Sequence, residues 1–371
     1  MTKITLKISE LRKQTGIGQQ ELAEVLGVTY QSVSKWETGA TMPDISLLPG
    51  IAEYFHVSVD ELLGLKPLRQ QQYIPRNSDD RRYWNENTDK LYQNRKYFLN
   101  EDYLKFLVDH VWQIIMPINV IDFRCGDGFL GRKLLELLPK GSTYTGVDTE
   151  IFLDKAKITF EDSGIEAKFL PSDIYSLDTG KKYDIAICIA NLRHMNKPLE
   201  ALTRMVEAVK KDGLVVCIEV NREFENDGLY IEGIPYDYLC TEFDYHPLWR
   251  KELECEGRDY AIGMRLPFYM QRLGLQDIGI RMNDKVLFAN PMQSDYEQVM
   301  QDFIHINSLD QSWSISDHES LIEFFMNRGI TRADAEGFVK MQAKVANHFS
   351  KTDMEQSFLK VQGLLITYGR K

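Results

Sequence analysis

Hydrophobic and polar positions follow two different patterns along the 371-residue chain. Up to about residue 64, short amphipathic stretches alternate with turn residues, which predicts five short helices in a compact all-α domain. From residue 118 onward, short apolar runs alternate with amphipathic stretches, which predicts a doubly wound parallel sheet. We expect strands at 118–123, 142–147, 165–170, 183–189 and 213–220, and helices at about 128–138, 150–163 and 198–210.

A glycine-containing turn joins the first expected strand to the first expected helix, in the stretch DFRCGDGFLG (122–131). Gly126 and Gly128 allow the backbone to approach a ligand, and the N-terminus of the following helix favours anionic groups. Arg124 stands where such a turn usually has glycine. A ligand is therefore expected here, and Arg124 either bonds its anionic end or lies across the slot and excludes it.

Acidic residues at the ends of three successive strands predict a site for an adenosine. Asp122 closes the first strand, and Asp148 lies 20 residues after Gly128, at the place for holding a ribose diol. Asp173 follows the third strand, where it is placed to accept from an adenine amino group while Ile174 covers the ring. A dinucleotide dehydrogenase is disfavoured, because the glycines do not follow the G-x-G-x-x-G spacing.

These motifs resemble those of class I S-adenosylmethionine-dependent methyltransferases over roughly residues 83–371. VIDFRCGDGFLG is similar to their first motif, YTGVD to their second and PSDIYSLD to their third, while YDIAICIANLRHM resembles the strand and loop along which methionine and substrate lie. The resemblance implies S-adenosylmethionine as cofactor and a mainly parallel seven-stranded sheet whose last strands, 278–288 and 364–371, suit antiparallel positions. The cofactor-binding residues that it implies are Asp122, Arg124, Gly126, Gly128, Asp148, Asp173, Ile174, Ala190 and Asn191.

Catalytic residues are less evident, because methyl transfer needs in-line placement above all. His194 in NLRHMN is close in sequence to the cofactor loop and is a candidate general base, while packing or hydrogen bonding is its commoner use. The insertion at 221–263 is aromatic and acidic and lies where the family builds its substrate pocket, which favours an organic small molecule.

A helical block is expected at about 293–350, between the last two strands. Phe338, Met341, Val345 and Phe349 form an apolar stripe at helical spacing. Thr331 with Asp334 can open this helix, and Ser316 with Glu319 an earlier one. Packing on the sheet domain is the first interpretation of the block; a lid or a dimer contact is the alternative.

The first 64 residues resemble the Xre/Cro-type helix-turn-helix regulators. QQELAEVLGVTYQSVSKWETGATMPD (19–44) matches that family almost throughout, including W-E-x-G after the recognition helix. The resemblance implies a double-stranded DNA operator as partner, read in the major groove; binding of another protein is the alternative. The residues implied to face DNA are Gln19, Thr29, Tyr30, Gln31, Ser32, Ser34 and Lys35.

Charge limits how tightly one copy can hold DNA. Residues 1–64 carry five basic groups against eight acidic ones, and the whole chain has a formal charge of −11. Phosphate neutralisation supplies much of DNA affinity, so we expect a homodimer with recognition helices about 34 Å apart. The segment 65–82 adds basic residues and reads as a linker that either grips the DNA backbone or is merely solvated.

The expected organisation is thus multidomain: a five-helix helix-turn-helix domain (1–64), a basic linker (65–82) and an α/β Rossmann-like methyltransferase domain (83–371). The five cysteines show no metal-ligand spacing and are expected to be buried, and no apolar run nears the roughly 20 residues needed to span a bilayer, so a cytoplasmic protein without a metal site is expected. Two functions stay open. One is a DNA-binding regulator fused to a working small-molecule methyltransferase, and the other is a ligand sensor without turnover.

Overall fold

The computed structural model describes residues 4–15, 17–55, 57–65, 73, 75, 88–161, 167–180, 182–221, 228–239, 243–309, 315–350 and 355–371. The chain divides into two compact units, Met1–Ile74 with Glu319–Arg328, and Pro75–His318 with Gly329–Lys371. The borders expected at 64 and 82 stay predictions, because most of the segment between them lies outside the described residues.

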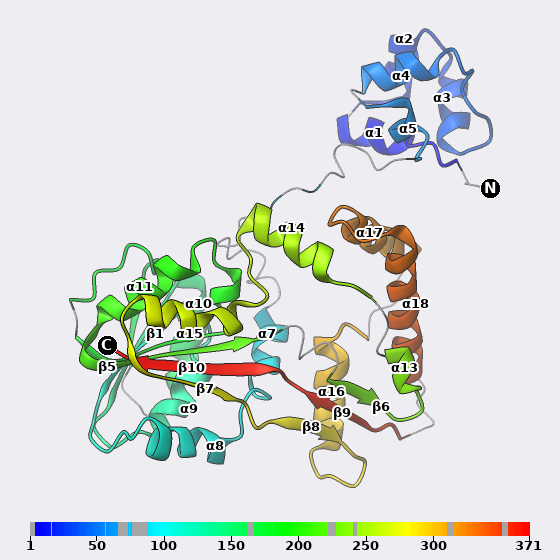
Figure 1. The fold of residues 1–371 in the computed structure, drawn as a ribbon. Coiled ribbons are helices and arrows are strands. Elements are labelled where there is room, and N and C mark those ends of the chain that lie inside the picture. Colours follow the sequence, from blue (N-terminus) through cyan, green and yellow to red (C-terminus); the bar gives the residue numbers. More distant parts are fainter. Residues whose placement is uncertain are drawn as a thin grey trace. The chain divides into compact units, whose positions relative to one another are not determined.

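The N-terminal unit contains the five short helices that the sequence predicts (Figure 1): α1 (Ile8–Thr15), α2 (Gln19–Leu26), α3 (Tyr30–Glu37), α4 (Leu48–Tyr54) and α5 (Val59–Leu62). Gly27 ends α2 in the left-handed region (φ +65°), which allows the tight turn into α3. Thr29 caps α3 by accepting from the Ser32 N–H. Leu22, Ala23, Val33 and Trp36 are buried in one core with Ile8 and Leu62.

The second unit is built on a seven-stranded sheet of order β3-β2-β1-β4-β5-β10-β7. Its strands are β1 (Asn119–Phe123), β2 (Thr143–Asp148), β3 (Ala167–Pro171), β4 (Tyr183–Ile189), β5 (Val209–Val220), β7 (Gln276–Met282) and β10 (Leu364–Arg370). β10 runs antiparallel to both β5 and β7, and the other pairs are parallel. The expected mainly parallel sheet is confirmed. Its strand order reverses between β1 and β4, where such sheets bind ligands at the carboxyl ends.

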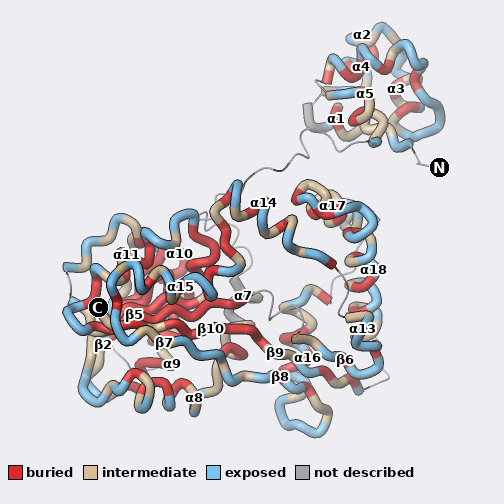
Figure 2. The backbone as a smooth tube through the Cα atoms, in the orientation of Figure 1, coloured by how far each residue is buried: buried red, intermediate tan, exposed pale blue. Residues whose placement is uncertain are grey.

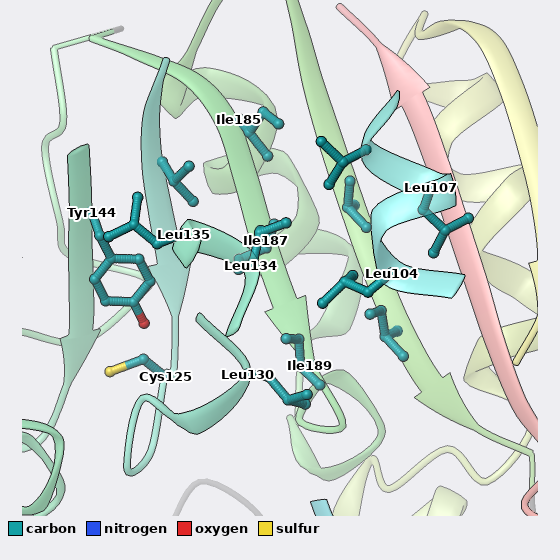
Figure 3. Close-up of a cluster of buried hydrophobic side chains, with 14 of the residues drawn as sticks. Leu104, Leu107, Cys125, Leu130, Leu134, Leu135, Tyr144, Ile185, Ile187 and Ile189 are labelled. Atoms are coloured by element: carbon teal, nitrogen blue, oxygen red, sulfur yellow. The ribbon is translucent and has the colours of Figure 1, made fainter. Parts of the chain in front are cut away.

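Helices cover both faces of this sheet. One face carries α8 (Glu101–Phe106), the π-helical turn η2 (Leu107–Val111), α9 (Phe129–Leu137) and α10 (Glu150–Glu161), and the other carries α11 (Pro198–Ala208) and α15 (Ile262–Arg272). Figure 2 shows the inner strands β5 and β10 as largely buried. Leucines of α8, η2 and α9 surround the isoleucines of β4 (Figure 3). This packing fixes the strand ends from which the candidate site is built.

A second, smaller sheet was not expected. β6 (Leu229–Ile231), β9 (Phe358–Val361) and β8 (Val286–Ala289) pair antiparallel in that order. The prediction of one strand at 278–288 is therefore wrong: β7 and β8 belong to different sheets. The break has a physical cause, because Asn283 turns its side chain to the backbone, donating to the Phe98 carbonyl at 3.0 Å and accepting from the Leu364 N–H at 3.2 Å.

Two helices of the expected block, α16 (Tyr296–Ile306) and α18 (Arg332–Phe349), pack against this small sheet. Most of the third helix, α17 (Ile315–Met326), belongs to the N-terminal unit, and the shorter α13 (Tyr236–Leu239) and α14 (His246–Glu256) precede the block. Thr331 caps α18 by accepting from the Asp334 N–H, as expected; the side chain of Ser316 lies outside the described residues. The apolar stripe of α18 is buried in one core with Phe358 of β9, which agrees with the packing interpretation.

Cysteine burial follows the prediction in part. Cys125, Cys188 and Cys217 are buried free thiols, whereas Cys255 is exposed, and Cys240 lies outside the described residues. Among the described helices, none has both the length and the apolar character needed to cross a membrane.

Candidate functional site

The ends of β1 and β2 form one loop cluster around the predicted glycine turn. Gly126 (φ +62°) and Gly128 (φ +72°) both adopt the left-handed conformation that glycine favours. The N–H of Gly126 donates to Asp148 Oδ2 at 2.9 Å, and the N–H of Thr149 donates to Oδ1 of the same carboxylate at 2.8 Å. Asp148 therefore fixes the glycine turn as well as standing at the predicted ribose position.

Asp122 is buried directly behind this turn. The Tyr144 hydroxyl donates to its Oδ2 at 2.7 Å, while Oδ1 has no hydrogen-bond partner among the described residues. Burial raises the pKa of Asp122 to about 7, against the opposite effects of Tyr144 and Arg95. Gly131 makes room for this arrangement, because a Cβ there would lie 2.4 Å from the Tyr144 hydroxyl. Asp122 is thus a buried acceptor suited to a cationic donor.

Two non-glycine residues hold left-handed conformations at the ends of the neighbouring strands β1 and β4. They are Arg124 (φ +56°) and Ala190 (φ +53°), and each costs roughly 1–2 kcal/mol of backbone strain. One side chain ties the two turns together, since Asn191 Nδ2 donates to the carbonyls of Arg124 at 3.0 Å and Ile189 at 2.7 Å. Arg124 itself is only 8% exposed, so its side chain is not extended into solvent.

The two residues predicted for the adenine end differ in exposure. Asp173 is exposed, and its Oδ1 accepts from the Tyr175 N–H at 2.9 Å, which fixes the turn after β3. Ile174 is buried in the core with Phe123 and Val147. A surface hollow of about 570 Å³ follows on the far side of this turn, lined by residues 175–180 and α11 and by none of the predicted site residues. The adenine contacts of Asp173 and Ile174 stay predictions.

Arg95 is a site residue that the sequence did not reveal. It ends α7 (Thr88–Arg95), and its Nη1 donates to Asp127 Oδ1 at 3.0 Å and to the Cys125 carbonyl at 3.3 Å. A Cβ added to Gly126 would lie 2.5 Å from the same Nη1. No motif marks this arginine in the aromatic-rich helical segment, so only the fold brings it to the glycine turn.

Glu219, near the end of β5, is the second residue that was missed. It is 0% exposed, and its Oε1 accepts from the N–H of Asn191 at 2.9 Å and of Leu192 at 2.7 Å. Burial raises its pKa to about 7, against the lowering effect of Arg193 and these backbone donors. A signal was present in the sequence, because an acid inside the apolar run LVVCIEV is costly unless it has partners.

His194 lies in the 3₁₀ turn η3 (Leu192–His194) beside this glutamate's loop. It is buried, and its Nε2 accepts from Arg193 Nε at 2.9 Å. A guanidinium at that nitrogen disfavours protonation of the imidazole, which a general base must undergo. The catalytic role of His194 stays a prediction, and the contact favours the hydrogen-bonding alternative.

The DNA-facing residues predicted on α3 divide into two groups. Tyr30, Gln31 and Lys35 are exposed, with Tyr30 47% accessible. Thr29 and Ser32 bond each other at 2.9 Å and serve the helix cap. Ser34 is half-buried. The DNA contacts of these six residues stay predictions.

Gln19, also predicted to face DNA, is held inside the domain. Its amide donates to Glu37 Oε2 at 2.7 Å, and Arg12 pairs with Oε1 of the same glutamate at 2.6 Å. Although burial alone would raise the pKa of Glu37, hydrogen bonds from Arg12 and Gln19 hold it below its usual value. The W-E-x-G motif thus supplies a core tryptophan, Trp36, and Glu37, the acidic member of a partly buried ion pair. DNA contact by Gln19 stays a prediction.

The loops that follow β1 and β4 are joined by Asn191 and together form the β1–β4 junction. The residues at this junction fit S-adenosylmethionine. Gly126 and Gly128 supply a backbone cradle, Asp122 has a buried acceptor atom without a partner among the described residues, and Asp148 stands at the predicted ribose position. Together with Arg95 they match a ligand that carries ammonium, carboxylate and ribose hydroxyl groups.

Comparisons with known proteins agree with both halves of this description. Residues 8–62 match the family described as helix-turn-helix, and residues 120–213 match the family described as methyltransferase domain. The first unit therefore carries an Xre/Cro-type helix-turn-helix domain. The second carries a class I S-adenosylmethionine-dependent methyltransferase domain.

Individual relatives are distant. The chain is 26% identical over 121 residues to a ubiquinone biosynthesis O-methyltransferase of Rickettsia conorii, covering 32% of this chain and 40% of that enzyme. The same enzyme of Dinoroseobacter shibae is 24% identical over 209 residues, covering 56% and 71%. The chain spans about half the length of the Rickettsia enzymes that it matches. Phosphoethanolamine N-methyltransferase 2 of Haemonchus contortus aligns with a TM-score of 0.44 and 11% identity, covering 81% of this chain and 60% of that one.

Proposed function

We propose that the protein is a DNA-binding transcription regulator fused to an active S-adenosylmethionine-dependent methyltransferase that acts on a small molecule. The observation that carries the enzymatic half is the junction of β1 and β4, where Asn191 joins two left-handed turns beside Asp122 and Asp148. A strained junction that side-chain hydrogen bonds hold in place is maintained at a binding site more often than in a plain core.

Each side chain of the junction has a distinct task in binding. The Asp148 carboxylate orients the glycine turn and takes the ribose hydroxyls, and Asp122 accepts from the methionyl ammonium. The left-handed turns at Arg124 and Ala190 hold the backbone of both loops in place at the carboxyl ends of β1 and β4, where the cofactor is proposed to bind. S-adenosylmethionine supplies the electrophilic methyl group when bound, so the protein's main contribution is to hold the acceptor in line and to exclude water.

The acceptor is proposed to be an organic small molecule. The insertion after β5 provides aromatic side chains at 229–260, including a stacked pair formed by Tyr245 and Trp249 with ring centroids 5.7 Å apart. Trp249 also stacks on Tyr260 at 5.6 Å. Aromatic surfaces of this kind suit a flat or apolar acceptor. A polynucleotide acceptor would instead call for a basic surface, and this segment contains an excess of acids.

Regulation of transcription is proposed from the exposed face of α3. Tyr30, Gln31 and Lys35 offer hydrogen bonds and one positive charge, while the rest of the domain is acidic. A single copy then has few phosphate contacts, so we propose that two copies bind a two-fold-related operator. Analytical ultracentrifugation of the full chain with and without a selected operator tests this step; a stable one-to-one complex would contradict it.

A sensor without turnover is the second candidate, and Arg124 is the observation that favours it. This residue replaces glycine at the turn, and its side chain is buried rather than extended into solvent. A single-turnover assay separates the two candidates: the full chain is loaded with methyl-labelled S-adenosylmethionine and mixed with a metabolite panel. Label transfer to an acceptor supports the enzyme, and retention of intact cofactor throughout the panel supports the sensor.

A further inference from the structure

Glu219 stands behind both loops of the β1–β4 junction without belonging to either of them. It lies on β5, on the other side of β4 from β1 in the sheet order. Its Oε1 accepts two backbone N–H groups from the loop after β4, those of Asn191 and Leu192. Asn191 in turn donates to the Arg124 carbonyl in the loop after β1. A continuous hydrogen-bonded path therefore joins three neighbouring strand ends.

We infer that Glu219 is a positioning residue, which holds the Asn191 and Arg124 turns in the geometry that receives the methionyl end of the cofactor. The inference rests on the proposed function, because it assigns a role within the same cofactor site. Both turns carry backbone strain, because Arg124 and Ala190 occupy the left-handed region without being glycine. Such conformations persist only where the surroundings over-determine them, and the buried carboxylate provides that constraint.

The ionised form of Glu219 is the one that holds the loops best. Charge-assisted hydrogen bonds to a carboxylate are about twice as strong as bonds between neutral groups. Its pKa of about 7 places the loss of this charge near neutral pH. Cofactor affinity is therefore expected to fall as pH is lowered from 8 to 6.

Ionisable side chains from η3, β4 and β5 face Glu219. Arg193 on η3 is the cation that faces it. Cys188 on β4 and Cys217 on β5 also face it, and burial raises the pKa of both thiols well above their usual value, so they stay neutral. From the opposite side α15 presents Gly263, whose added Cβ would lie 3.6 Å from Glu219 Cβ.

Glu219→Gln tests the inference, because it keeps the shape and an amide oxygen acceptor but removes the charge. Calorimetry on the full chain compares two ligands at pH 8: S-adenosylmethionine and 5′-methylthioadenosine, which shares the adenosine but lacks the aminocarboxyl end. We expect Glu219→Gln to weaken S-adenosylmethionine binding at least fivefold and to leave 5′-methylthioadenosine binding within twofold. A merely structural defect would weaken both ligands alike, and that result would overturn the inference.

The pH profile gives the second measurement. Asp122 also titrates near pH 7, so wild-type affinity carries contributions from two acids, and Glu219→Gln should remove one of them. The change in affinity between pH 8 and pH 6 should become at least threefold smaller in the variant. Asp302→Asn is the matched control: Asp302 is a buried acid on α16 whose pKa, despite burial, is held low by Lys96 and Tyr97. Its removal should leave the neutral-pH profile as in the wild type.

The failures of the two proposals are distinguishable. If wild-type protein binds neither ligand, the proposed cofactor function is wrong. If wild-type protein binds S-adenosylmethionine, and Glu219→Gln folds and keeps both the wild-type affinity and its pH dependence, the cofactor assignment stands and the role of Glu219 is refuted.

Discussion

The guanidinium of Arg95 occupies the space that a side chain at Gly126 would need, because a Cβ at position 126 would be 2.5 Å from Nη1. Arg95 ends a helix that precedes the sheet, whereas Gly126 lies in the turn after β1. The same guanidinium pairs with Asp127 at 3.0 Å. It also opposes the rise that burial causes in the pKa of Asp122. One cation from outside the methyltransferase motifs therefore offsets the negative charge of the cofactor turn.

Arg95→Gln should lower the free energy of unfolding of the methyltransferase domain. The Arg95 and Asp127 side chains are 11% and 12% exposed, so Asp127 would lose its partner in a place that water reaches poorly. We expect a loss of about 1–3 kcal/mol, measured by urea unfolding. Arg204→Gln is the matched control, because it removes the exposed Arg204–Glu207 pair and should change stability by less than about 1 kcal/mol. Equal effects of the two variants would count against a structural role for Arg95.

Arg124→Gly decides whether Arg124 blocks or merely borders the cofactor slot. Glycine adopts φ +56° without strain, which gains roughly 1 kcal/mol and is partly offset by the larger entropy of the unfolded chain. We expect unfolding stability to change by less than about 1 kcal/mol and S-adenosylmethionine to bind no more tightly than to the wild type. Calorimetry showing tenfold tighter binding, about 1.4 kcal/mol, would identify Arg124 as a block and favour the sensor.

Two buried acids make the stability of the domain depend on pH. Burial raises the pKa values of Asp122 and Glu219 to about 7 from ordinary values of 3.8 and 4.5. Between pH 4 and 7 the folded state therefore binds more protons than the unfolded state, and unfolding stability falls as pH rises through this window. The decline amounts to about 4 kcal/mol for Asp122 and about 3 kcal/mol for Glu219, and it should end above pH 7.

Urea unfolding at intervals from pH 4.5 to 8 measures this decline. Asp122→Asn, which cannot ionise, should flatten it by about half. An unchanged slope in that variant would mean that Asp122 does not titrate in this range.

Gln31→Ala should weaken binding to a specific operator more than binding to random DNA. A glutamine that reads a base edge contributes about 1–3 kcal/mol of discrimination. Gln20→Ala is the matched control, because Gln20 is exposed on α2 and its amide bonds Glu24 at 3.2 Å. Gel-shift titrations at one fixed salt concentration measure both variants. Equal losses on specific and random DNA would remove Gln31 from the base-reading residues.

Strand and helix positions in the parallel half of the sheet could be predicted because each apolar run is short, buried and bounded by turn residues. The predicted strand at 183–189 has the bounds that the structure shows. At 278–288 the apolar pattern continues across a break, and the side chain of Asn283 directs the chain from one sheet into another. No local pattern carries that information, because the partners of Asn283, Phe98 and Leu364, are distant in sequence.

The candidate site likewise contains some residues that the sequence predicts and others that only the fold reveals. Asp122, Gly126 and Asp148 lie at strand ends, where motif spacing and burial locate them. Arg95 reaches the site only through tertiary packing of α7, and its helix has no distinguishing pattern. Glu219 was recognisable as an acid within an apolar run, but its partners could not be derived without the register that places it beside the loop after β4.

Isothermal titration of S-adenosylmethionine into the wild-type chain and into Asp148→Ala at pH 8 tests the central claim most directly. The Asp148 carboxylate bonds the Gly126 N–H and stands at the predicted ribose position, so its loss should remove charged acceptor bonds of about 1.5–3 kcal/mol each. We predict that the wild type binds the cofactor and that folded Asp148→Ala, verified by circular dichroism, binds it at least tenfold more weakly. Absence of binding to the wild type, or equal affinity of the two proteins, would contradict the assignment of this turn as the cofactor site.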